Sequence, residues 1–393
     1  MKRNPLYSIV IPHFEQMPYI FGALDSVFSQ TYDNIELIVI DDASGTYDEP
    51  LIRQYVEKHA GPNIVRFELL HNEVNLGTCR SLNRACAAAG GKYMQIFAAD
   101  DELTNSQVVE NFVSYLEKTP EASFVSAMAL MYDNNMEAFI EFFSSASSQI
   151  NLMRMTAAQQ YALLTKACVV AMGSSCFTAE LYKTQGPFNE ANRLIEDWTF
   201  FLKITRSGVK IHTTLFPALK HRDGGVSHDL SGGEISATRL QYCIDVLQTR
   251  ETEILPFLKS LPMPLQLHAY REYLLDVKNL AAAGGRYAPV SRWRILKSNT
   301  ALARRLTMDA LVVFARKKSQ IQNAAVRSFF LFVLSLVALN YLTVPFLSAA
   351  FSVLSVLFLV LSAIFAALYL SCLFIDIMRF LKRQLAALKN ARR

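Results

Sequence analysis

The chain is poor in cysteine, and the apolar run near its amino terminus is short. Its 393 residues contain six cysteines and no Cys-x-x-Cys pair, so we expect reduced cysteines with structural roles. The apolar run near the amino terminus, residues 9–11, ends at Pro12. That run is too short for the core of a signal peptide, so we expect the globular part to stay in the cytosol.

Charged residues and histidine are absent from residues 329–375, about 47 positions. A straight helix of that length would span roughly 70 Å, more than twice the hydrocarbon core of a bilayer. Asn340 and Pro345 favour a break near the middle. We therefore expect a transmembrane hairpin with helices over about 329–346 and 351–375. A buried helical hairpin in a soluble domain is the alternative.

Basic residues flank this run on both sides. Residues 286–327 hold ten Lys or Arg against one Asp, and residues 379–393 hold six with no acid. Because the whole chain carries a net charge of +5, the remainder is acidic. The positive-inside bias predicts that both ends of the hairpin lie in the cytoplasm. The basic pattern over 292–313 indicates amphipathic helices on the bilayer or a linker packed on the preceding domain. Nucleic acid is a less favoured partner, since the basic stretch adjoins the membrane segment.

Strand and helix patterns alternate through the first half of the chain. Apolar strands are expected at residues 7–11, 36–40, 65–70, 93–97 and 123–131, with helices at 19–28, 49–59, 78–89, 106–118 and 196–206. This alternation predicts an α/β fold with a mostly parallel sheet covered on both faces. Residues 235–283 are expected to be helical.

Paired acids follow two of these strands, Asp41-Asp42 and Asp100-Asp101. In an open parallel sheet, ligands bind beyond the carboxyl ends of the strands. An acidic edge repels a diphosphate unless a divalent cation bridges them. The pattern therefore favours an enzyme that uses a nucleotide sugar.

The composition divides the chain into four parts. We expect a catalytic domain over 1–234, a basic helical membrane-proximal region over 235–327, the transmembrane hairpin over 328–376 and a basic cytoplasmic tail over 377–393. The predicted location is the inner, cytoplasmic membrane, with the catalytic domain facing the cytoplasm.

Several short motifs occur along the predicted domain, namely YSIVIPHFE at 7–15, SVFSQTY at 26–32, ELIVIDDAS at 36–44, NLGTCRSLN at 75–83 and GGKYMQIFAADD at 90–101. Together they resemble family 2 glycosyltransferases of the GT-A fold. The resemblance covers about the first 230 residues. It implies a Rossmann-like nucleotide-diphospho-sugar transferase domain of the GT-A fold, followed here by the helical region and the two transmembrane helices.

The resemblance also implies a donor site. The residues that would border or shape it are Pro12, His13, Phe14, Glu15, Asp41, Asp42, Asn75, Gly77 and Asn83. One of the two aspartates would accept hydrogen bonds from the nucleoside. Asp42 could instead cap a turn or the next helix, and Gly77 could simply begin a helix.

The metal motif of the family is Asp-x-Asp, and the matching triplet here is Ala98-Ala99-Asp100, in which the first acid is missing. The resemblance assigns Asp100 to Mg²⁺ or Mn²⁺, with Asp101 supporting it or the sugar. The cation would bridge the diphosphate and stabilise the leaving nucleotide. The missing acid leaves the strength of metal dependence open.

Transfer needs a base that takes the proton of the acceptor hydroxyl. The family places an acid pair at the start of a helix, and Glu196-Asp197-Trp198 matches it. We predict Asp197 as the base and Glu196 as its neighbour; helix-dipole stabilisation alone is the alternative. Arg222, in a loop that resembles the one closing over the donor, would pair with phosphate oxygens.

The expected function is inverting transfer of a sugar from a nucleotide sugar, with a UDP-sugar favoured, to a lipid-linked glycan in surface-polysaccharide synthesis. One rival is an enzyme that charges polyprenyl phosphate with a single sugar. A rival of another class is a catalytically silent membrane scaffold, suggested by Ala98.

Overall fold

The computed structural model describes residues 4–143, 145–223 and 236–309, and the single positions 323, 327, 356, 360 and 363. Contacts divide the chain into one unit over residues 1–299 and another over 300–393. Among the described residues, no helix is long and apolar enough to cross a membrane. The predicted hairpin and basic tail lie outside the described residues.

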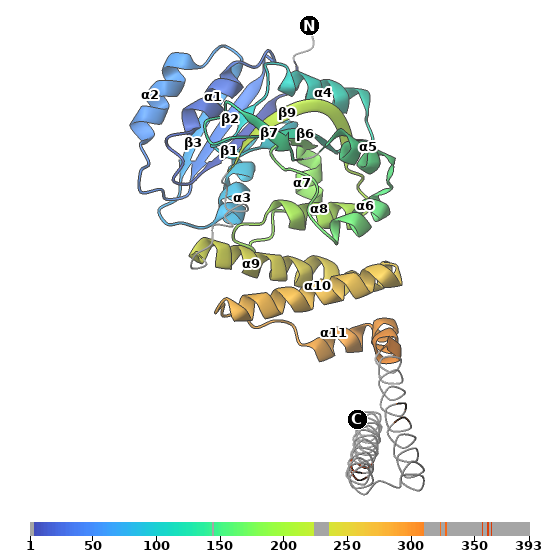
Figure 1. Ribbon diagram of the computed structural model, residues 1–393. Coiled ribbons are helices and arrows are strands. Elements are labelled where there is room, and N and C mark those ends of the chain that lie inside the picture. Colours follow the sequence, from blue (N-terminus) through green and yellow to red (C-terminus); the bar gives the residue numbers. More distant parts are fainter. Residues whose placement is uncertain are drawn as a thin grey trace, which may run out of the picture. The chain divides into compact units, whose positions relative to one another are not determined.

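Four parallel strands form one half of the sheet (Figure 1). They are β1 (Tyr7–His13), β2 (Ile35–Asp41), β3 (Ile64–His71) and β4 (Tyr93–Ile96), in the order β3-β2-β1-β4. Nearly every residue of β1 and β2 is buried, because their apolar runs face helices on both sides. The register pairs His13 with Asp41, so both strands end at the same level.

The other half of the sheet is mixed, which corrects the expectation of a mostly parallel sheet. It contains β8 (Ser175–Thr178), β6 (Phe124–Tyr132), β9 (His212–Arg222), β5 (Glu102–Leu103) and β7 (Phe139–Phe142). β8 lies antiparallel between β4 and β6, whereas β6 and β9 run parallel. β5 and β7 pair antiparallel with β9 and β6. The sequence did not reveal β8 and β9, because their residues show no clean two-residue alternation.

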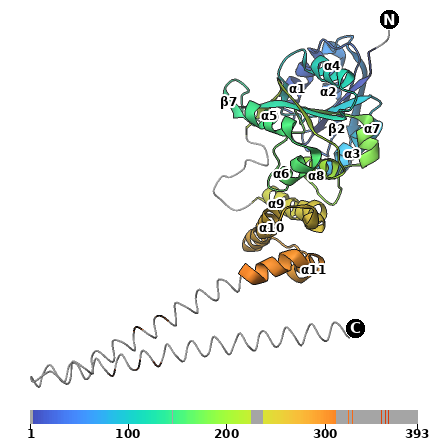
Figure 2. The same cartoon turned by 90° about the vertical axis from the view of Figure 1, so that its right-hand side faces the viewer.

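Helices cover both faces of the sheet (Figures 1 and 2). One face carries α1 (Ile20–Phe28), α2 (Glu49–His59) and α4 (Val108–Lys118), whose buried apolar side chains belong to the same core as those of β1 and β2. The remaining helices of this domain are α3 (Thr78–Ala88), α5 (Ala146–Arg154), α6 (Ala157–Leu164), α7 (Ala179–Gln185) and α8 (Asp197–Arg206). The predicted helices near 19–28, 49–59, 78–89, 106–118 and 196–206 are confirmed within about two residues.

Helices also follow the sheet domain, as predicted for residues 235–283. They are α9 (Ala237–Thr249), the π-helical turn η1 (Arg250–Ile254), the 3₁₀ helix η2 (Leu255–Ser260), α10 (Met263–Ala282) and α11 (Arg292–Ser298). Arg206 of α8 pairs with Glu253 at 2.5 Å, and Arg250 pairs with Asp276 of α10 at 2.7 Å. These ion pairs join the helical segment to the sheet domain and to itself.

Candidate active site

Two adjoining cavities open near the carboxyl ends of β1, β2 and β4. The large cleft has a volume of about 630 Å³ and the small cavity about 240 Å³. Pro12, Thr78 and Ala98 line both, so the two spaces meet at these residues. A pair of cavities therefore lies where the ligand crevice is predicted, and ligand binding there stays a prediction.

The two cavities differ in charge. Among the described residues that line the large cleft, Arg193 is the one lysine or arginine, and Asp42 is the one carboxylate. The small cavity is lined by Asp101, Glu196, Asp197 and His221. An anionic group is therefore better accommodated in the large cleft, and a neutral polar group in the small cavity.

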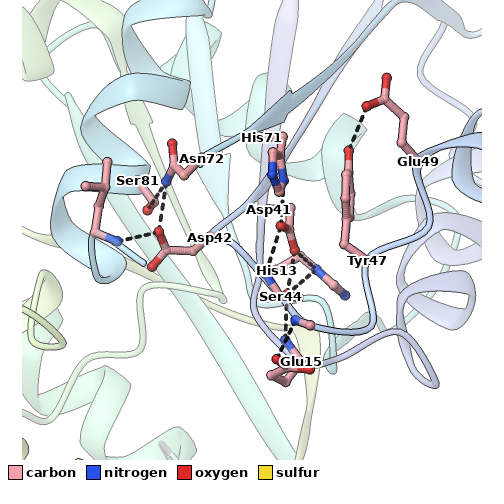
Figure 3. Close-up of polar contacts among 12 residues, drawn as sticks. His13, Glu15, Asp41, Asp42, Ser44, Tyr47, Glu49, His71, Asn72 and Ser81 are labelled. Atoms are coloured by element: carbon pink, nitrogen blue, oxygen red, sulfur yellow. Dashed lines mark hydrogen bonds and ion pairs between the residues drawn. The ribbon is translucent and has the colours of Figure 1, made fainter. Parts of the chain in front are cut away.

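Asp41 is fully buried and belongs to a network of side chains (Figure 3). Its carboxylate accepts hydrogen bonds from His13 Nδ1 at 2.6 Å, Ser44 Oγ at 2.5 Å and His71 Nδ1 at 2.9 Å. Burial raises the pKa of Asp41, but the bonds from Ser44 and His13 outweigh burial, so the pKa lies below its usual value. The ring of Tyr47 stacks on His71 with 4.7 Å between centroids.

Asp42 turns to the other side of the strand end and holds the next loop (Figure 3). Its carboxylate accepts hydrogen bonds at 2.8 Å from Asn72 Nδ2 and from the backbone N–H groups of Leu76 and Gly77. Asp42 therefore caps the loop that leads into α3, and it also lines the large cleft. Its predicted contact with a nucleoside stays a prediction.

The end of β1 lines the large cleft with Pro12, His13 and Phe14. The Phe14 side chain is 47% exposed, which leaves an aromatic face available. Glu15 does not line either cavity; its carboxylate accepts hydrogen bonds from Gly45 N at 2.6 Å and Thr46 Oγ1 at 3.1 Å. Glu15 therefore holds the turn after β2, and any contact with the donor stays a prediction.

The loop before α3 contributes Asn75 and Gly77 to the large cleft. Asn83 lies elsewhere on α3 and does not line either cavity. Its side chain bonds the backbone of Phe188 at 2.8 and 3.0 Å and the hydroxyl of Tyr182 at 2.9 Å. These contacts join α3 to α7 and to the segment after it.

Asp100 and Asp101 differ in their surroundings. Asp101 is buried and accepts hydrogen bonds from His221 Nδ1 at 3.0 Å and Arg222 N at 3.1 Å. Asp100 is half-buried, and within the described residues its carboxylate accepts no hydrogen bond from another residue. Burial, and then the charge of Asp101, raise the pKa of Asp100 to about 6.

These surroundings fit a divalent cation with few protein ligands. The described residues contain no group of three or more His, Cys, Asp or Glu side chains that could hold a metal ion. Mg²⁺, however, is commonly held by one or two carboxylates together with water and substrate phosphates. The unpaired Asp100 carboxylate suits that mode, whereas Asp101 is already engaged.

Arg222, at the end of β9, is held beneath the site. Its Nε donates to the Asp100 carbonyl oxygen at 3.0 Å, its Nη1 donates to the Asn134 carbonyl, and its guanidinium lies 4.3 Å from the Tyr19 ring centroid. Burial lowers the pKa of the neighbouring His221, but the bond to Asp101 outweighs burial and the pKa lies above its usual value. The Nε and Nη1 donors of Arg222 would have to leave these partners to bind phosphate.

Glu196 and Asp197 stand at the start of α8, and both line the small cavity. Asp197 accepts hydrogen bonds from Trp198 N at 2.6 Å and from the Cys168 thiol at 3.6 Å. Burial raises the pKa of both carboxyls, and the charge of Asp197 raises that of Glu196 further. Burial therefore disfavours the simultaneous ionisation of both carboxyls.

The sequence interpretation missed Arg193, Leu194 and the residues of α9 that line the large cleft, namely Ala237, Thr238 and Gln241. The available signal was the position of Arg193, three residues before the acid pair, but a lone arginine in a loop is common. The contribution of α9 depends on packing between distant parts of the chain.

Comparison with known proteins identifies the first half of the chain. Residues 8–171 match the family described as Glycosyl transferase family 2, and this similarity supports a transferase enzyme. The mixed α/β sheet agrees with the GT-A fold class expected from the motifs.

Individual relatives match over limited lengths. "Putative colanic acid biosynthesis glycosyl transferase WcaA" of Escherichia coli K12 is 35% identical over 108 residues, which cover 28% of this chain and 37% of that protein. A "PGL/p-HBAD biosynthesis glycosyltransferase" of Mycobacterium bovis BCG is 23% identical over 199 residues, 51% of this chain and 69% of that protein. The chain thus spans little more than a third of the first relative.

Among solved structures, the mannosyltransferase PcManGT of Pyrobaculum calidifontis, in complex with GDP-Man and Mn²⁺, is 19% identical. The similarity covers 80% of this chain and 81% of that one, with a TM-score of 0.48.

Proposed function

We propose that this chain is an inverting glycosyltransferase that moves a sugar from a nucleotide sugar to a lipid-linked glycan. The observation that carries the proposal is the pair of joined cavities with different charge. The large cleft offers Arg193 and an exposed aromatic ring, whereas the small cavity offers the acid pair of α8. A nucleotide sugar fits this arrangement, because its anionic nucleotide suits the large cleft and its neutral sugar suits the small cavity.

The donor would lie across both cavities. Its nucleoside would contact Pro12, His13 and Phe14 in the large cleft, and its sugar would enter the small cavity past Ala98 and Thr78. Phe14 can stack on a base through its exposed face. A UDP-sugar is the first donor to test.

Asp197 is the proposed base. Its two hydrogen-bond donors favour the ionised form, while no other described residue donates a hydrogen bond to the Glu196 carboxyl, so Glu196 keeps the proton when the pair holds one. The ionised Asp197 would accept the proton of the acceptor hydroxyl as the oxygen attacks the anomeric carbon. A single displacement of this kind inverts the configuration at that carbon.

The residues around Asp100 would hold Mg²⁺ or Mn²⁺, which would neutralise charge on the departing nucleoside diphosphate. Burial of Asp101 against His221 and Arg222 keeps the loop after β4 in place for this role. In this proposal the Asp100 carboxyl binds the cation, and the Asp101 carboxyl holds the loop in place.

The acceptor and the location are proposals drawn from the sequence. The uncharged residues 329–375, flanked by basic segments, support a membrane anchor with the catalytic domain on the cytoplasmic side. An acceptor on a lipid carrier would then be presented at the same surface.

The test is an assay of nucleotide release by the purified full-length chain, over a panel of nucleotide sugars, with and without lipid extract. Asp197→Asn should reduce transfer by about 10²- to 10⁴-fold, the usual contribution of a positioned base. Nucleotide affinity should be nearly unchanged, because Asp197 does not line the large cleft. Glu180→Gln, at an exposed acid in the first turn of α7, is the matched control.

Tight nucleotide binding without transfer in the wild type, for every donor and lipid tested, would reject the proposed function and favour a silent scaffold. An unchanged transfer rate in Asp197→Asn would remove Asp197 from the mechanism and make Glu196 the next candidate.

A further inference from the structure

Arg193 carries a positive charge that the rest of the described chain does not neutralise. It lines the large cleft, its side chain is exposed, and it forms no ion pair with a described carboxylate. Nη2 donates to the Asn75 carbonyl oxygen at 3.0 Å and also to Asn75 Oδ1. A guanidinium has five N–H donors, so the donors on Nε and Nη1 stay available to a ligand.

The backbone around Arg193 is fixed by a buried acid from another part of the chain. Asp245 of α9 is fully buried, and its Oδ2 accepts hydrogen bonds from the N–H groups of Arg193, Leu194 and Ile195 at 2.9, 2.5 and 3.2 Å. Its Oδ1 accepts a bond from Gln241 at 2.8 Å. A carboxylate that receives several N–H groups holds a loop firmly.

Gly77 allows Arg193 to approach the loop before α3. Its φ is +87°, and a Cβ at this position would lie 2.4 Å from Arg193 Cγ and 2.8 Å from the Arg193 carbonyl oxygen. A side chain at position 77 would therefore displace Arg193 from the cleft. The Arg193 guanidinium is thus held at the wall of the large cleft by Gly77, Asn75 and Asp245.

We propose that Arg193 is a fixed cationic ligand of the donor's diphosphate, positioned by Asp245 of α9. This inference rests on the proposed function and names the group that holds the anionic part of its donor. Guanidinium suits phosphate because two parallel N–H groups match two oxygens. Arg222, in contrast, is engaged by the Asp100 and Asn134 carbonyls.

The proposal also bears on the acid that is missing at position 98, because a second cationic group would share the neutralisation of the diphosphate. A cation held by Asp100 alone would neutralise part of the diphosphate, and Arg193 would neutralise part from the side of the large cleft. Nucleoside diphosphate should consequently bind in excess chelator, with lower affinity than in the presence of Mg²⁺. The helical segment after the sheet domain would then be part of the donor site through Asp245.

The test measures binding of uridine, UDP and GDP to the full-length chain by calorimetry, with Mg²⁺ and with excess chelator. Arg193→Met should weaken binding of the diphosphates by about 10- to 100-fold, the range for a hydrogen bond to a charged group. Uridine affinity should not change, and Arg193→Lys should recover part of the loss. Arg80→Met, at an exposed arginine of α3 that lies 3.6 Å from Glu190, is the matched control.

Asp245→Asn tests the positioning role. It should weaken UDP binding in the wild-type background and have no further effect in the Arg193→Met background, because Asp245 acts through Arg193. Independent, additive losses would show that Asp245 only supports the fold.

Unchanged UDP affinity in Arg193→Met, or an equal loss for uridine and UDP, would overturn the inference while leaving the proposed function intact. A wild type that binds no nucleoside diphosphate under any condition would reject both.

Discussion

Replacing Asp100 with asparagine is expected to stabilise the fold above pH 6 while impairing transfer. Burial and the charge of Asp101 raise the pKa of Asp100 to about 6 in the folded chain, against about 4 in an unfolded chain. Between these values the folded state binds more protons, so its stability falls as pH rises through this window. At about 1.4 kcal/mol for each tenfold change, ionised Asp100 costs up to about 3 kcal/mol.

The assay is thermal unfolding of the full-length chain in detergent with excess chelator, since a bound cation would remove the penalty. Asp100→Asn should raise the melting temperature by several degrees at pH 7.5, with the two curves converging below pH 4.5. Asp133→Asn is a control that should change the melting temperature in the opposite direction, lowering it at pH 7.5. Bonds from Ala138 N and Glu137 N lower the pKa of Asp133, so its charge stabilises at neutral pH and the effect is lost in acid.

A lower or equal melting temperature for Asp100→Asn at pH 7.5 would refute this reasoning, because it would mean that the ionised carboxylate is not penalised in the fold. Loss of transfer in the same variant, with the donor still bound, would agree with a cation held at this position.

Three other predictions concern the cleft, the metal and the membrane. Gly77→Ala should weaken nucleotide binding and lower the melting temperature, since a Cβ would overlap Arg193; unchanged affinity, measured by calorimetry, would contradict this. Excess chelator should abolish transfer reversibly, and full activity would exclude a metal at Asp100. Cysteines placed at Arg327 and Arg379 should both be protected from an impermeant thiol reagent in intact cells; opposite accessibility would exclude the hairpin.

The order of the main elements from β1 to β6 could be predicted from the sequence alone. Continuous apolar runs such as residues 37–40 form strands because a sheet covered by helices buries both faces of each strand. The acids after β2 and β4 could be placed at one edge because parallel strands end there together. The acid pair at the start of α8 was predicted from the family resemblance. The uncharged run over 329–375 is likewise a property of the sequence by itself.

The tertiary structure decided the partners of those acids and the second half of the sheet. Asp41 and Asp42 are adjacent in sequence, yet one is engaged by His13 and His71 and the other caps the loop before α3. Strand β8 lies between β4 and β6, although about 80 residues separate β8 from β4 along the chain. The physical reason is that such contacts form between segments distant in sequence, where local propensity carries no information. Arg193 illustrates this most clearly, because Asp245, about fifty positions later, sets the backbone that carries it into the cleft.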